Sequence, residues 1–490
     1  MSRPERLIVI GNGMAGARFV EDLLDYGAGD RFDINVFGDE RHGNYNRILL
    51  SSVLAGGHVP KDIFLNPLSW YSTHGVKLHA GLRVESIDLR SKRITAQTGL
   101  VKEYDKLVIA TGSRARVVPI DGLVTATGQF KDGVFVFRTL DDCDRILDYA
   151  KHARRVAVIG GGLLGIEAAR GLLARGLDAH IIHLNSHLMD TQLDAPAGAV
   201  LQRQLEQVGL HVHLDKVAQA ILGDDAVAGL AFNDGATLDC DMIVISAGIR
   251  PNTELATCAG LEVRRGIVVG DDLACRNAPM VYAIGECAEH HGRMYGLVAP
   301  LWEQAQVLAA RLSGRDPQGL YTGSKTSTKL KVVGLDVAVM GEKEPVDDED
   351  EVVTYAEPAR GVYKKLVVRG DRLIGAIVIG DGAVVPSLVH AFAESRPLTA
   401  NRAELLFTEV AADDRETLQN SLPDTAQIAT ATSSRKPRSS RRYLKAPGAC
   451  TPFARRRGPV PAVVRVSRRC RRLSMLPASA CRAPRREIRT

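Results

Sequence analysis

Two glycine-rich motifs constrain the fold of this 490-residue chain more than any other feature of its sequence. One spans residues 11–16 after the apolar residues 7–10, and the other spans residues 160–165 after the apolar residues 156–159. In a strand–turn–helix context, the first glycine permits a tight turn, the second lets the backbone approach a pyrophosphate, and the third packs helix against strand. The phosphates then accept hydrogen bonds at the positive end of the helix dipole. Two such motifs predict two bound dinucleotides with electron transfer between them.

The sequence pattern around the first motif is repeated around the second. Residues 105–112 and 241–248 each read as a buried strand that ends in a glycine turn. We therefore predict an α/β fold with two Rossmann-like dinucleotide-binding domains, a small C-terminal α+β domain and a disordered basic tail. The predicted parts are residues 1–122 with 246–320 for the first domain, which is discontinuous, 123–245 for the second, 321–407 for the small domain, 408–428 for a linker and 429–490 for the tail.

The small domain is predicted from a change of pattern near residue 325. Strand-like apolar patterns cover residues 329–340, 362–368 and 373–379, and an amphipathic stretch follows at residues 384–394. The acidic run at residues 347–351 reads as a solvated turn. We expect this domain to cover the first of the two dinucleotide sites or to form an interface.

Composition separates the tail from the rest of the chain. Residues 429–490 carry 18 Lys and Arg against one acidic residue, which leaves −11 for residues 1–428 given the net charge of +6. The basic balance is therefore no evidence for a nucleic-acid partner of the body. No apolar run approaches the roughly 18–20 residues of a membrane span, and the early first strand leaves no room for a signal peptide, so a cytoplasmic location is expected.

A group of sequence motifs beyond the bare glycine patterns points to one family. These motifs lie at residues 10–16, 44–52, 160–167, 192–194, 285–287 and 295–300. On them, residues 4–428 resemble the two-dinucleotide-fold flavoprotein oxidoreductases of the pyridine nucleotide-disulfide oxidoreductase-like superfamily. Within that superfamily they are most similar to the N-terminal, FAD- and NAD-binding half of the large subunit of NAD(P)H-dependent assimilatory nitrite reductase.

The resemblance implies an FAD-dependent NAD(P)H oxidoreductase. In the full-length relatives electrons pass from NAD(P)H to FAD, then to an iron–sulfur centre and siroheme, which reduces nitrite to ammonia. This chain would keep only the diaphorase half, because the ligands for [2Fe–2S] and siroheme occur only in those relatives. Two alternatives remain open, a ferredoxin- or rubredoxin-type NAD(P)H reductase and a non-catalytic flavin-binding electron-transfer subunit. The expected partners are NAD(P)H and an iron–sulfur or siroheme acceptor, without nucleic acid or membrane, and a homodimer is possible.

The resemblance and the local chemistry together assign a set of FAD contacts. The glycines of the first motif approach the pyrophosphate, Asp39 or Glu40 bonds the adenosine ribose, and Glu286 accepts a bond from a ribityl hydroxyl. Arg47 would offset phosphate or flavin charge, against the alternative of a solvated loop charge. Related ferredoxin reductases have a lysine at the position of Ser52, so an ion pair beside flavin N5 is in doubt. The predicted FAD contacts are Gly11, Gly13, Met14, Ala15, Gly16, Asp39, Arg47, Ser52, Ala110, Thr111, Gly112, Gly285, Glu286 and Ala299, and Ala247 and Gly248 are predicted cofactor contacts assigned to neither dinucleotide.

The second motif supplies the predicted nicotinamide contacts. Glu167 would point toward the stacked nicotinamide and flavin, so it is a catalytic candidate together with Arg47. The strand end that commonly carries a ribose-binding acid has His183 instead, and no arginine follows at once, which slightly favours NADH over NADPH. The predicted contacts are Gly160, Gly162, Leu163, Leu164, Gly165, Glu167 and His183.

Cysteine and histidine patterns predict no metal centre. No Cys-x-x-Cys or Cys-x₄-Cys pair occurs, so Cys287 and the other cysteines of the body are expected to be packing residues. The adjacent His290 and His291 lack partners at metal-ligand spacing.

The tail is the anomaly of the sequence. After residue 428 the chain becomes rich in Arg, Ala, Pro and Ser without periodicity, which is typical of disorder. Two interpretations stay open, a basic arm and the product of a reading-frame shift in a GC-rich gene. In the shifted frame, residues 429–437 can encode a C-x-C-N-x-V opening like that of the family's iron–sulfur domain. The DNA sequence around codon 428 distinguishes them.

Overall fold

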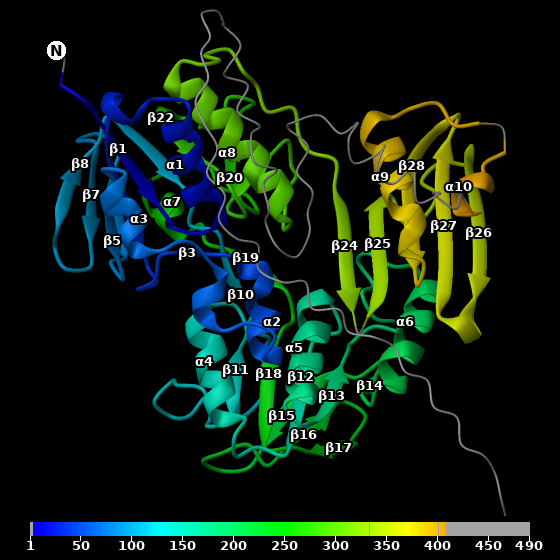
Figure 1. Cartoon of the computed structure of the whole chain (residues 1–490). Coiled ribbons are helices and arrows are strands. Elements are labelled where there is room, and N and C mark those ends of the chain that lie inside the picture. The colour runs from blue at the N-terminus through cyan, green and yellow to red at the C-terminus, as the bar shows by residue number, and fades with distance from the viewer. Residues whose placement is uncertain (1–2, 333, 400, 408–490) are drawn as a thin grey trace, which may run out of the picture. The chain divides into compact units, whose positions relative to one another are not determined.

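A computed structural model describes residues 3–332, 334–399 and 401–407 (Figure 1). The predicted linker at 408–428 and the predicted tail at 429–490 lie outside the described residues. Among the residues described, no helix is both long enough and apolar enough to cross a membrane.

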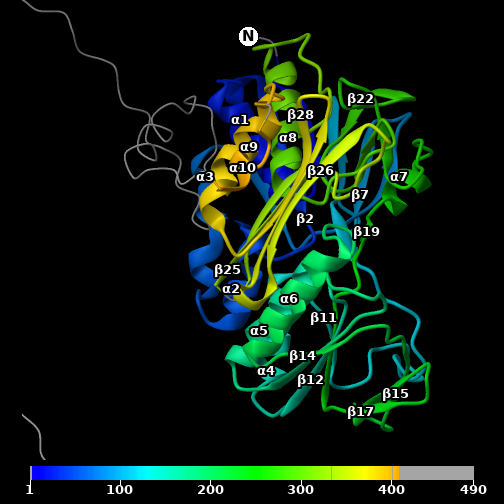
Figure 2. The ribbon, with the colours of Figure 1, turned by 90° about the vertical axis from the view of Figure 1, so that its right-hand side faces the viewer.

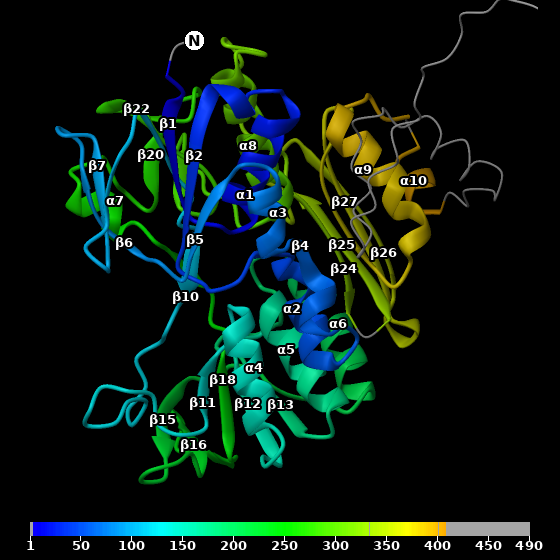
Figure 3. The same ribbon diagram turned by 60° about the vertical axis from the view of Figure 1, so that its left-hand side comes forward.

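The first glycine motif lies at the centre of an eight-stranded sheet. Five neighbouring strands of this sheet are parallel, and in the register Val9 lies opposite both Val36 and Val108. These three valines are fully buried because both faces of a parallel sheet are covered. Helices α1 (Met14–Asp25) and α8 (Val298–Ser313) lie side by side (Figure 3). The parallel strands, in spatial order, are β22 (Ala278–Ala283), β9 (Lys106–Ile109), β1 (Glu5–Ile10), β2 (Phe32–Gly38) and β5 (Lys77–Ala80).

A second, five-stranded parallel sheet repeats this arrangement around the second motif. Helix α5 (Leu163–Ala174) follows its central strand, as α1 follows β1. Each module also carries a three-stranded antiparallel insertion, β6 to β8 (84–103) in the first and β15 to β17 (218–239) in the second. The sheet order is β11 (Val134–Val136), β18 (Met242–Ile245), β12 (Arg155–Ile159), β13 (Asp178–Ile182) and β14 (His211–His213).

Two connections join the modules. Strands β10 (Ser113–Ala115) and β19 (Ile249–Pro251) form an antiparallel pair where the chain passes between the two sheets. Helix α2 (Leu50–Ala55) packs on α5, and Arg175 Nε donates to the carbonyl of Leu54 at 2.9 Å. The fold class predicted from the sequence is confirmed, whereas the boundaries at 122/123 and 245/246 stay predictions.

The small C-terminal part is an antiparallel sheet packed against α9 (Val385–Glu394), as Figure 2 shows. The pattern at 329–340 forms two strands instead of one, and the expected turn at 347–351 is partly strand. Asp350 begins β26, where its carboxylate pairs with Arg369. This edge strand was missed because its charged and half-exposed residues lack an apolar alternation. The strand order is β24 (Ser327–Val332), β25 (Leu335–Gly341), β28 (Arg372–Ile379), β27 (Val362–Arg369) and β26 (Asp350–Glu357).

The sequence motif at 192–194 forms the contact between the small sheet and the second module. The Asp194 carboxylate caps α6 (Ala195–Gln207) through the N–H of Ala197. The same carboxylate accepts hydrogen bonds from Tyr363 Oη at 2.6 Å and from Lys365 Nζ at 2.9 Å. Asp194 and Lys365 are both buried, so this ion pair is a firm link between β27 and α6.

Candidate dinucleotide sites

The first glycine turn leaves open space only at its middle glycine. Gly11 has φ +114°, and a Cβ there would lie 2.0 Å from the carbonyl oxygen of Ala110. A Cβ on Gly16 would lie 2.1 Å from the Gly11 oxygen, so these two glycines are required by packing. A Cβ on Gly13 would meet no described atom within 4 Å beyond its chain neighbours. The turn therefore presents bare backbone to a free space, as a pyrophosphate requires.

The second turn has the same geometry. Gly160 has φ +124°, and a Cβ there would lie 2.2 Å from the Ser246 oxygen. A Cβ on Gly165 would lie 1.9 Å from the Gly160 oxygen, whereas one on Gly162 would meet no atom of the described chain within 4 Å. The two turns thus agree glycine by glycine, and each fits a dinucleotide.

The helices that follow these turns begin without side-chain caps. Gly13 and Gly162 are the N-cap residues of α1 and α5, and neither helix, within the described residues, has a side chain bonded to its first N–H groups. The predicted contacts Met14, Leu163 and Leu164 form these first turns. Free N–H groups and the helix dipole favour an anion at both positions.

Two further predicted segments lie against the first turn. Ala110 packs against Gly11, and Thr111 Oγ1 donates to the carbonyl of Asn252 at 2.7 Å. Gly285 lies against Ala15, since a Cβ there would be 3.0 Å from the alanine methyl. The segments lie together because parallel strands β1, β9 and β22 end at one edge of the sheet.

The remaining predicted flavin contacts, and the unassigned Ala247 and Gly248, flank this edge. Ala299 is exposed in the first turn of α8, and Trp302 of the same helix donates to the Met14 carbonyl at 3.1 Å. Gly112 lies at φ +63°, and Gly248 at φ +97° accepts a hydrogen bond from the N–H of Arg116. Ala247 precedes Gly248 at the end of β18.

The two acidic candidates for the adenosine ribose differ in their surroundings. The Asp39 carboxylate is exposed and lies 3.9 Å from Arg83. Glu40 is half-buried and accepts a hydrogen bond from Tyr45 Oη at 2.5 Å as well as an ion pair from Arg47. Asp39 is therefore the better placed of the two for a ribose hydroxyl.

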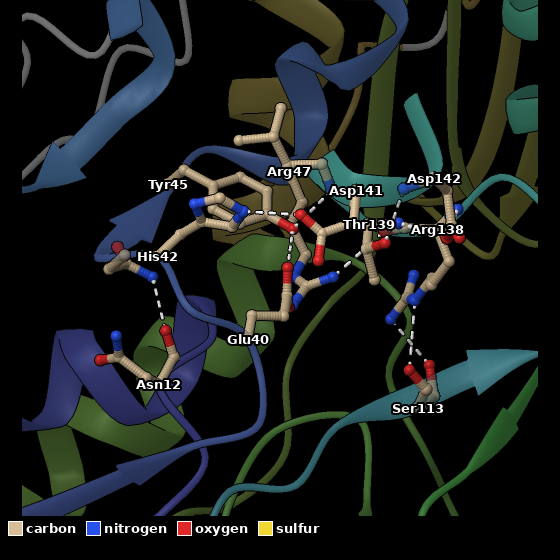
Figure 4. A network of polar contacts seen from close by, with 12 residues as sticks. Asn12, Glu40, His42, Tyr45, Arg47, Ser113, Arg138, Thr139, Asp141 and Asp142 are labelled. Carbon is tan, nitrogen blue, oxygen red and sulfur yellow. Dashed lines mark hydrogen bonds and ion pairs between the residues drawn. The ribbon is translucent and has the colours of Figure 1, made fainter. Parts of the chain in front are cut away.

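Arg47 belongs to a network of polar contacts and is not a solvated loop charge (Figure 4). It pairs with Glu40, lies over the Tyr45 ring and donates to the carbonyl of Arg138 at 3.1 Å. Burial opposes the charged form, but Tyr45 and Glu40 raise the pKa of Arg47 above its usual value. Burial also raises the pKa of Tyr45. Arg47 is thus a permanent cation held next to the predicted flavin segments.

The same network contains a residue that the sequence analysis missed. Arg138 forms an ion pair with Glu286, and Ser113 Oγ donates to that carboxylate at 2.6 Å (Figure 4 shows Arg138 beside Ser113). Glu286, predicted to bind a ribityl hydroxyl, is therefore engaged by two protein groups. Arg138 lies 148 positions from Glu286 in the chain, and no local motif marks it. In the structure a capping box formed by Thr139 and Asp142 begins the helix directly after Arg138.

Glu167 lies beside the loop that carries Arg47 and Ser52. Burial raises the pKa of Glu167 to about 6, and a hydrogen bond from Ser51 partly offsets the effect. Ser52 is one residue further along α2, and its hydroxyl contacts His58 Nδ1 at 2.7 Å. The packing of α2 on α5 thus brings the predicted nicotinamide residue next to the predicted flavin loop.

His183 faces the glycine turn of the second motif. Its Nδ1 accepts the N–H of Gly161 at 3.1 Å, and its Nε2 lies 3.1 Å from Asp190. The imidazole is buried under the turn, where it supports Gly161. Leu184, the next residue, is 62% exposed.

The cysteine and histidine beside Glu286 have structural contacts. Cys287 is fully buried, and burial raises the pKa of its thiol. His290 and His291 both contact one oxygen of Asp271, at 2.9 and 2.7 Å. Asp271 lies 19 positions from His290 and 20 from His291, so the sequence spacing did not identify it as their partner.

The two glycine turns have the same geometry, and helices α2 and α5 pack together between the modules that carry them. This arrangement defines the class of NAD(P)H-dependent flavoprotein oxidoreductases. Residues 5–309 match the pyridine nucleotide-disulphide oxidoreductase family, and residues 327–395 match the rubredoxin NAD+ reductase C-terminal domain. The chain belongs to the pyridine nucleotide-disulphide oxidoreductase family, as the resemblance predicted.

Individual relatives agree with this family. The chain is 44% identical to a nitrite reductase [NAD(P)H] of Bacillus subtilis (strain 168) over 77% of its own length and 46% of the relative. It is 41% identical to the assimilatory nitrate reductase electron transfer subunit of that organism, over 86% and 53%. The chain therefore spans about half the length of these relatives. A ferredoxin reductase from Rhodopseudomonas palustris is a structural neighbour at TM-score 0.69 and 26% identity, over 77% of this chain and 91% of the neighbour.

Proposed function

We propose that this chain is the electron-input part of a nitrite-reducing system. It would oxidise NAD(P)H and pass the electrons to an iron–sulfur or siroheme acceptor. The observation that carries the proposal is the joint match of its glycine turns and of most of its length to nitrite reductase and nitrate reductase electron-transfer relatives. A cytoplasmic location, where NAD(P)H is available, belongs to the same proposal.

The chain's own residues have binding and positioning roles in this reaction. FAD, when bound, supplies a ring that accepts a hydride and releases electrons singly, and hydride transfer needs no protein acid or base. The turns at Gly13 and Gly162 hold the phosphates, and the contact of α2 with α5 fixes the distance between the two sites. Arg47 supplies a fixed positive charge, and Glu167 with Ser51 occupies the junction of the two modules.

The test is reduction of the purified full chain by NADH. We expect a yellow protein whose visible absorbance bleaches on anaerobic addition of NADH and which then reduces an artificial dye. A colourless protein that takes up no FAD on reconstitution refutes the proposal. If the protein binds FAD but NADH does not bleach its absorbance, the non-catalytic flavin-binding subunit is the remaining interpretation.

We propose NADH as the preferred donor. His183 offers no cation for a 2′-phosphate, and the Asp190 carboxylate beside it would repel one. Leu184 is exposed directly after this strand, so Leu184→Arg places a guanidinium at the strand end. We expect this variant to raise kcat/KM for NADPH about tenfold, equivalent to about 1.4 kcal/mol, with less change for NADH. A control Leu184→Gln variant has similar bulk without charge. A wild-type preference for NADPH contradicts this assignment.

The C-terminal domain supports a second candidate, a reductase for a separate carrier protein. Residues 327–395 match the rubredoxin NAD+ reductase C-terminal domain, and the ferredoxin reductase neighbour has a similar fold. Steady-state assays with a rubredoxin, a ferredoxin and a siroheme-containing nitrite reductase fragment as acceptors separate the two functions. Turnover with a small carrier protein but not with the siroheme fragment favours the second candidate.

A further inference from the structure

A cluster of three histidines and one aspartate lies on the second sheet, away from the glycine turn. In the parallel register of β13 and β14, His180 pairs with His211, and Ile182 pairs with His213. Asp178 is two residues before His180 and therefore projects from the same face of β13. Two pairs of side chains, one on β13 and one on edge strand β14, are thus collected at one side of the sheet.

The distances in this cluster match those between two ligands of one tetrahedral metal ion. Oδ1 of Asp178 lies 3.3 Å from Nε2 of His180 and 3.3 Å from Nε2 of His211. For metal–ligand bonds of about 2.0–2.1 Å, two ligand atoms of a tetrahedron are about 3.3 Å apart. The second histidine–aspartate group differs, because His290 and His291 approach Asp271 at hydrogen-bonding distances of 2.9 and 2.7 Å.

The buried member of the cluster has an unused nitrogen. The His180 side chain is only 9% exposed, and its Nε2 has no hydrogen-bond partner among the described residues. Burying such a nitrogen without a partner is costly, and a cation would satisfy it. His211 is 57% exposed, which leaves an entry path and an open coordination position.

Two neighbouring groups hold the ligands in place. His180 Nδ1 contacts His213 Nε2 at 2.9 Å, which directs the lone pair of Nε2 toward Asp178 when Nδ1 carries the proton. Arg155 Nε donates to the other oxygen of Asp178 at 2.7 Å and leaves Oδ1 available.

We propose that Asp178, His180 and His211 bind one divalent cation of the Zn²⁺ or Co²⁺ type, with His213 as a positioning residue. Imidazole and carboxylate ligands in tetrahedral spacing suit these ions. The cation would clip edge strand β14 to β13, a role independent of electron transfer. This site was not expected from the sequence, where no metal centre was predicted.

The test is Co²⁺ titration of the metal-stripped full chain, followed by visible absorption, with Zn²⁺ as competitor. We expect tetrahedral Co²⁺ bands with a stoichiometry of about one per chain, and a Zn²⁺-dependent rise in melting temperature. His211→Ala is the primary variant because this side chain is exposed, and it should weaken binding more than tenfold and abolish the thermal shift. His213→Ala should weaken binding about 10–100-fold, as loss of a ligand-orienting group does.

The matched control is His291→Asn, which alters the other histidine–aspartate group and should leave Co²⁺ binding unchanged. Far-UV circular dichroism and FAD content establish that each variant is folded. Absence of Co²⁺ bands in the wild-type chain, or equal affinity in wild type and His211→Ala, overturns the proposal. Thiolate-to-metal absorption that persists in His211→Ala also overturns it, because a cysteine would then hold the ion.

Discussion

Gly11 and Gly13 of the first turn are needed for different physical reasons, and replacing each by alanine distinguishes these reasons. Gly11 adopts a positive φ and touches the Ala110 carbonyl, whereas Gly13 has ordinary extended φ and ψ and faces free space. A methyl group at position 11 would therefore strain the fold, whereas a methyl group at position 13 would collide only with a bound ligand. The same division holds for Gly160 and Gly162 in the second turn.

The first prediction compares Gly11→Ala with Gly13→Ala. Gly13→Ala should change the free energy of unfolding of the apoprotein by less than about 1 kcal/mol and weaken FAD binding at least about tenfold. Gly11→Ala should destabilise the apoprotein by about 1–3 kcal/mol, since the new methyl meets backbone. Urea denaturation and FAD titration measure the two effects. If Gly13→Ala binds FAD as tightly as wild type does, the phosphates do not bind at this turn.

Glu167 supports a prediction about pH. Its pKa rises from 4.5 to about 6 in the folded protein, so the folded state binds the proton more tightly than the unfolded state does. The stabilising contribution of the protonated group is complete below pH 4.5 and is lost as the pH rises through 6. The loss amounts to about 2 kcal/mol for a shift of this size.

The measurement is urea denaturation of wild type and Glu167→Gln at pH 4.5, 5.5 and 6.5. The difference in stability between the two proteins should grow with pH in favour of the glutamine variant, because glutamine cannot ionise. Glu85→Gln, a change of an exposed glutamate on β6, is the control. A pH-independent difference between wild type and Glu167→Gln would contradict the raised pKa.

At the scale of elements, the buried Asp194 joins α6 to β27. Its carboxylate caps the helix and neutralises Lys365, which is 5% exposed. Lys365 Nζ also contacts the exposed Glu344 at 2.6 Å, so removal of Asp194 leaves the buried ammonium with one solvent-exposed partner. Breaking a buried ion pair in this way costs more than the pair contributes. The link is therefore sensitive to truncation of either side chain but tolerant of their joint replacement.

We predict that Asp194→Ala lowers the free energy of unfolding by about 3–5 kcal/mol. Tyr363→Phe removes one hydrogen bond to the same carboxylate and should cost about 1 kcal/mol. Asp194→Ala combined with Lys365→Met should recover part of the loss, because no buried charge remains. Thermal denaturation of wild type, Tyr363→Phe, both single variants at positions 194 and 365 and their combination measures these differences. Equal stability of Asp194→Ala and wild type would show that the link is not formed.

At the scale of the whole molecule, the predicted site residues all lie between positions 11 and 299. The basic segment after residue 428 contributes none of them. We expect its excess of positive charge to increase nonspecific binding to polyanions without changing cofactor binding at the glycine turns.

We therefore predict that a chain ended after residue 428 keeps the FAD content, the NADH-dependent dye reduction and the melting temperature of the full chain. Heparin retention should fall sharply in the shorter chain, because the removed segment carries a charge of +17. If the shorter chain loses FAD, this prediction is wrong and the segment is needed for the fold or for cofactor binding.

Local backbone requirements were predictable from the sequence. The glycine motifs mark Gly11, Gly16, Gly160 and Gly165 in the sequence, and the strands and helices around them follow from apolar periodicity. The edge strand β26 was missed because its half-exposed side chains carry no such periodicity.

The sequence by itself determined the two glycine turns, the repeated α/β module and the flavoprotein class, since these depend on local patterns. Only the tertiary structure decided which distant side chains meet. The ion pair of Arg138 with Glu286, the link of Asp194 to Lys365 and the cluster around His180 all join residues from segments that are distant in the sequence. Such contacts depend on strand register and domain packing, and no spacing within one segment encodes them.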